Sequence, residues 1–224
     1  RMVEVAVDLG TKTVNTVSAF PFSIPAPRIT DRPQMQEFSV DYPAGLDWKQ
    51  NWEDYVAVIR SCCDICEDAG VRYALEPHPF RYMANAASML RLIEHVQSDA
   101  LGMNFDPSHL FPMGEIPHAV IYQLGDRIFH CHFSDNDGTT NAHWRPGKGK
   151  IDWTAVMRAL QETGFNGVIS IELEDVPGVA RGQADVPGVY KGNWDATAAF
   201  VQENQIAVAY LKGICATLGI PVTP

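Results

Sequence analysis

The chain of 224 residues (24.8 kDa) is long enough for one large domain or two small ones, and we expect a single domain over residues 1–224. With 46% hydrophobic and 20% charged residues, its composition excludes a disordered chain and a disulfide scaffold. The formal net charge of −10 at pH 7 repels phosphate backbones, which disfavours a nucleic-acid partner.

The sequence also argues against a membrane protein and a secreted one. It contains no run of roughly 18 apolar residues that could form a membrane span, and its first residues lack the regions of a signal peptide. The five cysteines leave one unpaired in any full disulfide scheme, which suits a reducing compartment. We therefore expect a cytoplasmic protein with no membrane partner.

Runs typical of β-strands alternate with amphipathic helical stretches along the chain, a pattern that predicts a parallel sheet wrapped by helices. The beginning of the chain resembles the end of a helix that leads directly into a strand. Strands are predicted at 13–19, 72–76, 101–106, 128–133 and 167–173, and helices at 48–69, 84–96, 116–124, 153–163 and 196–218. Gly70 and Gly164 end two of these helices just before a strand begins.

The predicted helix 48–69 contains a CCxxC cluster formed by Cys62, Cys63 and Cys66. Such a cluster can bind a metal or carry out redox chemistry. However, the three cysteines share one helical face with Val56 and Ile59, and a free cysteine packs as a small hydrophobe. We expect them to be buried in the core.

The long loops follow the strands, at 20–47, 135–150 and 175–194. In α/β folds the functional residues gather at this edge, the carboxyl ends of the strands. The last loop contains DVPGV twice, at 175–179 and 185–189, and its proline and glycine residues favour turns. Whether this loop closes over a site as a lid stays open.

Four of the five predicted strands end in a residue that can bind a metal ion: Glu76, Asp106, His132 and Glu172. A single carboxylate or histidine at a strand end is more often a helix cap or an ion-pair partner. Four of them at one edge of a sheet are costly to bury without a compensating cation. The oxygen-rich set favours Mn²⁺, Mg²⁺ or Co²⁺ with open coordination positions over a closed tetrahedral zinc site.

Several histidines lie close to these four residues in the sequence. His130 and His132 point to the same face of their strand, and we expect His130, one layer deeper, to pack beside the site and orient its neighbour. His109 lies three residues beyond Asp106, and His78 lies close behind the preceding strand. Each is a candidate for substrate binding, although either can instead form an ordinary hydrogen bond within its loop.

The segment RPGKGKIDW adds a basic loop to this edge. Arg145, with Gly147 and Gly149, can grip an anionic substrate oxygen or can belong to a plain solvated loop. The helix that follows is predicted to begin at Trp153, in the core, with Asp152 as its N-cap.

Six segments of the chain resemble, in their order and spacing, those of the xylose isomerase-like barrels, the sugar phosphate isomerase/epimerase family. They are VNTVSA, ALEPHP, NFDPSHL, LGDRIFHCHFSD, RPGKGKIDW and GVISIELED. This family includes ketose 3-epimerases, inosose dehydratases and apurinic endonucleases. The resemblance covers the chain from about Thr13 onwards. It implies an α/β fold, a (β/α)8 TIM-type barrel, from which about three N-terminal βα units would be missing, as in a fragment or a truncated product.

The resemblance also implies roles for individual residues. One divalent ion, for which we prefer Mn²⁺ although Mg²⁺, Co²⁺ or Zn²⁺ are alternatives, would be held by Glu76, Asp106, His132 and Glu172. The catalytic residues would be Glu76 and Glu172, which exchange a proton with the substrate. His109 and Arg145 would hold substrate oxygens, and we add His78 as a further candidate for substrate binding.

These residues predict an isomerase or epimerase that removes the proton next to a carbonyl through a metal-stabilised enediolate. Its substrate would be a small carbohydrate or polyol. The alternative is a lyase of the same family, because the same enolate can expel a β-substituent, as in inosose dehydration or eliminative cleavage of a 3-keto-glycoside. The sequence does not separate these two reactions.

Two further alternatives are less favoured. An apurinic endonuclease uses three zinc ions, and the chain offers His143 but has Asn141 where those enzymes place an aspartate. A non-catalytic, truncated barrel would expose strand edges, which ordinarily must be covered. We therefore expect a chain with an open edge to pair with another copy, as a homo-oligomer, or to aggregate.

Overall fold

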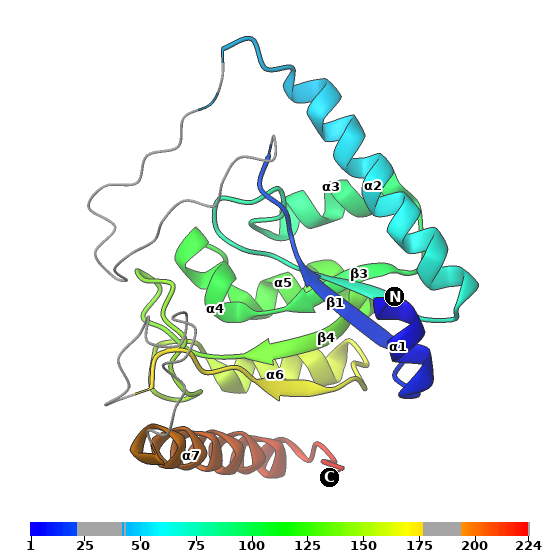
Figure 1. Cartoon of the computed structure of the whole chain (residues 1–224). Coiled ribbons are helices and arrows are strands. Elements are labelled where there is room, and N and C mark those ends of the chain that lie inside the picture. Colours follow the sequence, from blue (N-terminus) through cyan, green and yellow to red (C-terminus); the bar gives the residue numbers. More distant parts are fainter. Residues whose placement is uncertain (22–41, 43, 177–193, 224) are drawn as a thin grey trace.

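The structure is a computed structural model that describes residues 1–21, 42, 44–176 and 194–223. Within these residues strands and helices alternate as predicted (Figure 1). The possible lid lies almost entirely outside the described residues, because only the first two residues of its two DVPGV segments are included. Most of the predicted loop 20–47 also lies outside them.

In the described part of the chain, five parallel strands form one sheet in chain order, β1-β2-β3-β4-β5. They are β1 Thr13–Val17, β2 Arg72–Glu76, β3 Leu101–Phe105, β4 Ile128–Phe133 and β5 Ile169–Ile171. All five predicted strands are confirmed, although β1, β3 and β5 are shorter than predicted. Each strand pairs in parallel with its neighbour, and the sheet forms half of a TIM-type barrel.

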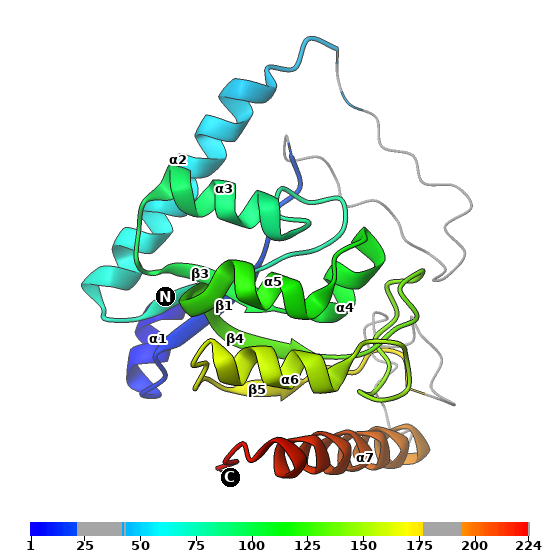
Figure 2. The same ribbon diagram turned by 180° about the vertical axis from the view of Figure 1, so that it is seen from behind.

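The helices follow one another around the outside of this half-barrel (Figures 1 and 2). They are α1 Met2–Asp8, α2 Trp48–Asp68, α3 Ala86–Val96, α4 Pro107–Leu110, α5 Pro117–Leu124, α6 Trp153–Glu162 and α7 Trp194–Leu218, with the 3-10 turns η2 Phe111–Met113 and η3 Gly125–Arg127. The long helix α7 runs beside α6 and contacts β5. Among the described residues, none of the helices combines the length and the apolar character of a bilayer span.

Capping side chains determine where several helices begin. The Asp152 side chain accepts a hydrogen bond of 2.9 Å from the Ala155 amide, which confirms it as the N-cap of α6. Helix α3 begins two residues later than predicted because Asn85 and Ser88 form a capping box there. The short helix α4 was not predicted, and it forms because Asp106 caps its start, with its side chain accepting from the Ser108 amide, and Pro107 occupies its first turn.

The hydrophobic core lies between the sheet and the helices. Phe105 of β3 and Phe133 of β4 are fully buried, and the ring of Phe133 contacts the indole of Trp153, a core residue as predicted. Cys63 and Cys66 belong to the same cluster, and all five cysteines are free thiols. The packing interpretation is therefore confirmed for Cys63 and Cys66, whereas Cys62 is only partly buried against the same cluster.

The predicted alternation of β4 is interrupted near its start. The pairing between β3 and β4 shifts register there, which leaves Phe129 as an extra residue. Its ring lies 4.7 Å from the guanidinium of Arg72 and so close to Gly102 that a Cβ there would come within 2.5 Å of it. Because Arg72 shares a face of β2 with Glu76, Phe129 faces the inner side of the half-barrel, whereas strict alternation with His130 and His132 would turn it to the outer side.

Candidate metal centre

Four polar side chains converge at the carboxyl ends of the strands. Glu76 is the last residue of β2, Asp106 directly follows β3, His132 lies near the end of β4, and Glu172 directly follows β5. Each offers one ligand atom, and these atoms all lie within 4.8 Å of one another. Parallel strands end at a common edge, so the fold brings together all four residues that the sequence singled out.

The Nδ1 atom of His132 lies at the centre of the group. It is 2.8 Å from Glu76 Oε1, 2.9 Å from Glu172 Oε2 and 3.1 Å from the side-chain nitrogen of Asn104. A ring nitrogen carries at most one proton, so it cannot donate a full hydrogen bond to two carboxylates at once. A shared cation would satisfy all three groups.

The environment of Asp106 most clearly favours a bound cation. Its side chain is fully buried, and its Oδ1 atom accepts hydrogen bonds from the amide and the hydroxyl of Ser108, at 2.8 and 2.7 Å. Its Oδ2 atom has no hydrogen-bond donor among the residues that the structure describes. A buried carboxylate oxygen without a donor is costly, and a divalent cation would remove that cost. The residues therefore fit a divalent metal ion.

The ionisation of the four residues reflects their crowding. Burial raises the pKa of Glu76, and burial together with the Glu76 charge raises the pKa of Asp106 well above its usual range. Burial alone would lower the pKa of His132, but hydrogen bonds to Glu172 and Glu76 outweigh it and raise the pKa to about 10. The hydrogen bond to His132 lowers the pKa of Glu172, against the effect of burial. Such an excess of negative charge attracts a cation.

Two residues beside the group were missed by sequence reasoning. Asn104 contacts His132, and Ser108 orients Asp106. Asn104 lies two residues before Asp106, on the same face of the strand, and this spacing is the signal that would have found it. Ser108 gave no signal of its own, because a serine after Pro107 is an ordinary residue of a first helical turn.

The predicted substrate-binding histidines lie next to the candidate metal centre. The His78 and His109 rings contact each other, with centroids 3.5 Å apart. His78 Nε2 is 4.0 Å from Glu76 Oε2, and His109 Nε2 is 3.7 Å from Asp106 Oδ2. His109 is almost fully buried, whereas about a fifth of the His78 side chain is exposed, at 22%. His78 is therefore the more accessible of the two.

Arg145 lies on the loop after β4 and contacts helix α7. Its Nε atom is 3.2 Å from Glu203 Oε2. The side chain is 25% exposed, and its charge is compensated by this ion pair. A role in substrate binding stays a prediction for this residue.

His130 occupies the layer below the centre, as predicted. Its Nε2 atom lies 3.0 Å from Ser170 Oγ, and its ring meets the ring of His132 edge-on, with centroids 5.2 Å apart. Burial, reinforced by the nearby His132, lowers the pKa of His130 to about 4. It is therefore neutral at pH 7 and suited to orienting its neighbour.

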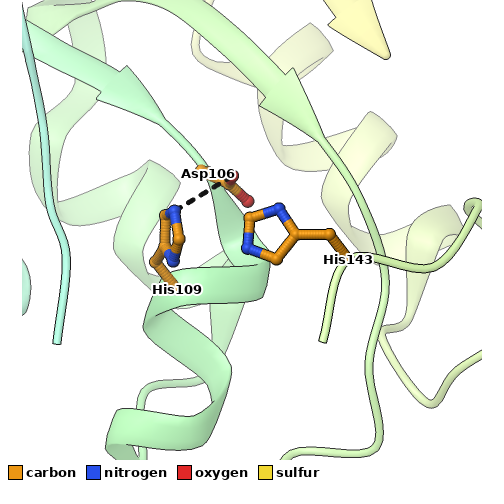
Figure 3. A group of neighbouring side chains, drawn as sticks. All are labelled: Asp106, His109 and His143. Atoms are coloured by element: carbon orange, nitrogen blue, oxygen red, sulfur yellow. Dashed lines mark ion pairs between the residues drawn. The ribbon is translucent and has the colours of Figure 1, made fainter. Parts of the chain in front are cut away.

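A second group of possible ligands adjoins the first. Figure 3 shows the rings of His109 and His143 on either side of the Asp106 carboxyl group, and one ligand atom from each lies within 4.8 Å of the others. The Asn141 side-chain oxygen lies 2.8 Å from His109 Nδ1. Because that oxygen belongs to a neutral amide, the only carboxylate of the second group is Asp106, which the first group already uses. The arrangement favours one ion over the several ions of an endonuclease.

A parallel half-barrel with polar residues gathered at the carboxyl ends of its strands defines a TIM-type α/β barrel. The chain belongs to the xylose isomerase-like TIM barrel family, which matches it over residues 1–203. This confirms the resemblance and the fold class expected from the sequence.

The chain is similar to sugar-converting relatives over part of their length. It is 27% identical over 125 residues to the fructoselysine 3-epimerase of Shigella flexneri, which covers 54% of this chain and 45% of the relative. It is 28% identical over 146 residues to the inosose dehydratase of Lacticaseibacillus casei, which covers 58% and 49%. The chain thus matches about half the length of these curated relatives.

Solved structures show the same fold. The chain superposes on a D-tagatose 3-epimerase-like protein with a TM-score of 0.66 and 22% sequence identity, which covers 96% of this chain and 68% of the other. At this identity the likeness supports the fold and leaves the reaction to be argued from the site.

Proposed function

We propose that the chain carries the metal-binding and proton-transfer residues of a divalent-metal-dependent sugar isomerase or epimerase. The observation on which this depends is the convergence of Glu76, Asp106, His132 and Glu172, with a fully buried Asp106 oxygen that has no donor within the described part of the chain. Membership of a family that contains sugar epimerases and inosose isomerases supports the same conclusion.

A bound divalent cation would polarise a substrate carbonyl and acidify the neighbouring C–H bond. The donor set of three carboxylates and one imidazole is rich in oxygen, which supports Mn²⁺ ahead of zinc. The remaining chemistry falls to residues of this chain. They must hold the substrate and move one proton.

Glu76 and Glu172 are placed to move that proton. They approach His132 from β2 and from the end of β5, so a sugar lying over the centre would have one carboxylate on each side. Removal of the proton by one carboxylate and its return by the other would invert the carbon centre, which is epimerisation. The Glu172 side chain, 37% exposed, is easier for a substrate to reach than Glu76, which is 5% exposed.

His78 and His109 supply hydrogen-bonding groups for substrate oxygens. Their rings, tilted against each other, lie next to Glu76 and Asp106, so a hydroxyl on the reacting part of the sugar would come within their reach. Arg145 would act at the rim of the site, from the loop after β4.

A lyase is the second candidate. It is supported by the inosose dehydratase relative, which matches this chain at an identity similar to that of the epimerase. The first step is shared, because loss of a β-substituent also begins with removal of a proton next to a carbonyl. The two reactions diverge only in whether the proton is returned or a leaving group departs.

One experiment tests the proposal. The Mn²⁺ content of the purified chain is compared with that of Glu172→Gln and His132→Ala, and with that of Glu94→Gln, an exposed glutamate on α3, as a matched control. Each protein is then incubated in D₂O with a panel of ketoses, inososes and 3-keto-glycosides. We expect Mn²⁺ binding and deuterium incorporation next to the carbonyl in the wild type and the control, and their loss in the two site variants.

The same panel separates the two candidate reactions. Deuterium in a recovered epimer or isomer supports the first, and an unsaturated or dehydrated product supports the second. Equal Mn²⁺ content in all four proteins would refute the proposed centre.

A further inference from the structure

Asp135 lies at the same end of the half-barrel but takes no part in either group of possible ligands. It stands three residues after His132, and its side chain is fully buried. Its Oδ2 atom accepts hydrogen bonds of 2.9 Å from the Gly147 amide, the Gly149 amide and the Trp153 indole nitrogen. Its Oδ1 atom accepts a hydrogen bond of 3.2 Å from the Ile151 amide. One carboxylate thus binds four donors from a single segment.

The spacing of these donors explains why glycine occurs at alternate positions in the segment RPGKGKI. The amides of residues 147, 149 and 151 all point towards the same carboxylate. The two amides that lie closest to it, at positions 147 and 149, belong to glycines. A Cβ on Gly149 would collide with the Asp135 carboxylate and the Asn136 carbonyl. Gly147 has a φ of +86°, a conformation that other residues rarely adopt. The glycines therefore permit this wrapping.

The backbone of Asp135 holds the start of the same segment. It pairs antiparallel with Trp144, with hydrogen bonds of 2.7 and 2.9 Å in the two directions. The side chain and the backbone of one residue thus fix the segment 144–151 from both ends. The donors are neutral, and the two oxygens of the carboxylate are occupied by them, so Asp135 is unsuited to binding a metal ion in this arrangement.

A second aspartate joins the residue just before this segment to the loop that follows Glu172. The Asp175 side chain accepts a hydrogen bond of 2.7 Å from the His143 amide, and the amides of Glu174 and Asp175 donate to the His143 carbonyl. Asp175 follows Glu172 by three residues, as Asp135 follows His132. The loops after β4 and β5 are therefore tied together, each close to a candidate ligand.

We propose that Asp135 is a positioning residue: it fixes the segment 144–151, which carries Arg145, at the same end of the half-barrel as the candidate metal centre, so that a sugar is bound in a defined orientation. This role rests on the proposed function, since it assumes that a sugar is bound there. Asp135 acts through the segment it holds and touches neither the ion nor the proton. Its loss should therefore weaken sugar binding more than it slows proton transfer.

The test uses Asp135→Asn, which keeps the size of the side chain but places an amide group among four donors. Asp137→Asn is the matched control, because Asp137 lies in the same loop and its hydrogen-bond donors among the described residues belong to Thr139 and Thr140. Gly149→Ala disturbs the same contact from the opposite side and serves as a second variant, should Asp135→Asn fail to fold. Hydrogen exchange of the metal-loaded proteins, followed by mass spectrometry, compares peptide 144–153 with the buried strand β3.

We expect exchange in peptide 144–153 to become at least about tenfold faster in Asp135→Asn and Gly149→Ala, with β3 and the control unchanged. With D-fructose as the probe, KM should rise about ten- to a hundredfold while kcat stays within about threefold and the Mn²⁺ affinity within about twofold. Unchanged exchange would show that Asp135 does not hold the segment. Faster exchange with an unchanged KM would overturn its role in binding, and a parallel loss of kcat and Mn²⁺ affinity would assign it to the metal centre.

The failure of this inference can be distinguished from failure of the proposed function. A wild-type protein that binds Mn²⁺ but neither exchanges deuterium with nor binds, by calorimetry, D-fructose or any other member of the panel used above refutes the substrate part of both. The exchange comparison of peptide 144–153 still decides whether Asp135 fixes the segment. If it does so and D-fructose binds without turnover, the calorimetric affinity replaces KM as the readout.

Discussion

Replacement of Asp106 by asparagine should change stability and metal affinity in opposite directions. Asparagine retains the oxygen that accepts two hydrogen bonds from Ser108, and it replaces the oxygen that has no donor by an amide group that can donate to neighbouring carboxylates. An unsatisfied buried polar group costs about 1–3 kcal/mol. We therefore expect Asp106→Asn to raise the free energy of unfolding of the metal-free protein by about that amount at pH 8.

The effect on metal binding has the opposite sign. Mn²⁺ at 100 times its Kd should stabilise the wild type by about 2.7 kcal/mol through mass action. The loss of one charged ligand should weaken binding by roughly a hundredfold, so that the same Mn²⁺ concentration stabilises the variant by only about 0.4 kcal/mol. Urea unfolding in EDTA and in Mn²⁺, followed by tryptophan fluorescence, measures both quantities.

A matched control separates these effects from a general loss of charge. Asp64→Asn removes an exposed carboxylate from α2 and should change neither quantity. An Asp106→Asn protein that is less stable than the wild type in EDTA, and that still gains the full stabilisation from Mn²⁺, would refute the reasoning about the buried oxygen.

Three further predictions test other parts of the structure. Ser108→Ala removes one of the two donors that orient Asp106, so Mn²⁺ affinity measured by calorimetry should fall about 10–100-fold; an unchanged affinity would exclude this orienting role. Gly102→Ala inserts a methyl group against Phe129 and should destabilise the protein by about 1–3 kcal/mol. Gly213→Ala on α7, with open space around it, should instead stabilise the protein by about 0.5–1 kcal/mol. Thermal unfolding of both variants measures the two changes in stability. In EDTA the protein should lose stability as pH rises from 6 to 10. The pKa values of Glu76 and Asp106 are raised in the folded state, so their contribution to the free energy of unfolding falls as pH rises from the ordinary to the raised pKa. The contribution of His132 to the same free energy is lost as pH approaches about 10. A urea midpoint that increases over this range would contradict the assigned directions.

The strands and the four candidate ligands could be predicted because both depend on local pattern. Short apolar runs bounded by helical segments define the strands, and a polar residue at the end of such a run lies at a known edge of a parallel sheet. This is sufficient to bring Glu76 and Glu172 together although 96 residues separate them along the sequence. The edge itself is a property of every parallel α/β fold.

The features that the sequence did not predict depend on contacts between residues that lie far apart along the chain. The inward turn of Phe129 depends on the register between β3 and β4, and no feature of the β4 sequence encodes it. The role of Asp135 depends on amides that lie 12 to 16 residues further along the chain, and a single aspartate after a strand is otherwise typical of a turn or a cap. The contact of Arg145 with Glu203 likewise joins a loop to a distant helix.

The claim that four side chains hold one divalent ion is tested most directly by pulsed electron paramagnetic resonance of the protein with bound Mn²⁺. We predict a coupling from a single ¹⁴N nucleus, which disappears in His132→Ala and persists in His130→Gln, the neighbouring histidine outside the ligand set. A Mn²⁺ spectrum without nitrogen coupling in the wild type, or a coupling that survives the loss of His132, would contradict the proposed centre.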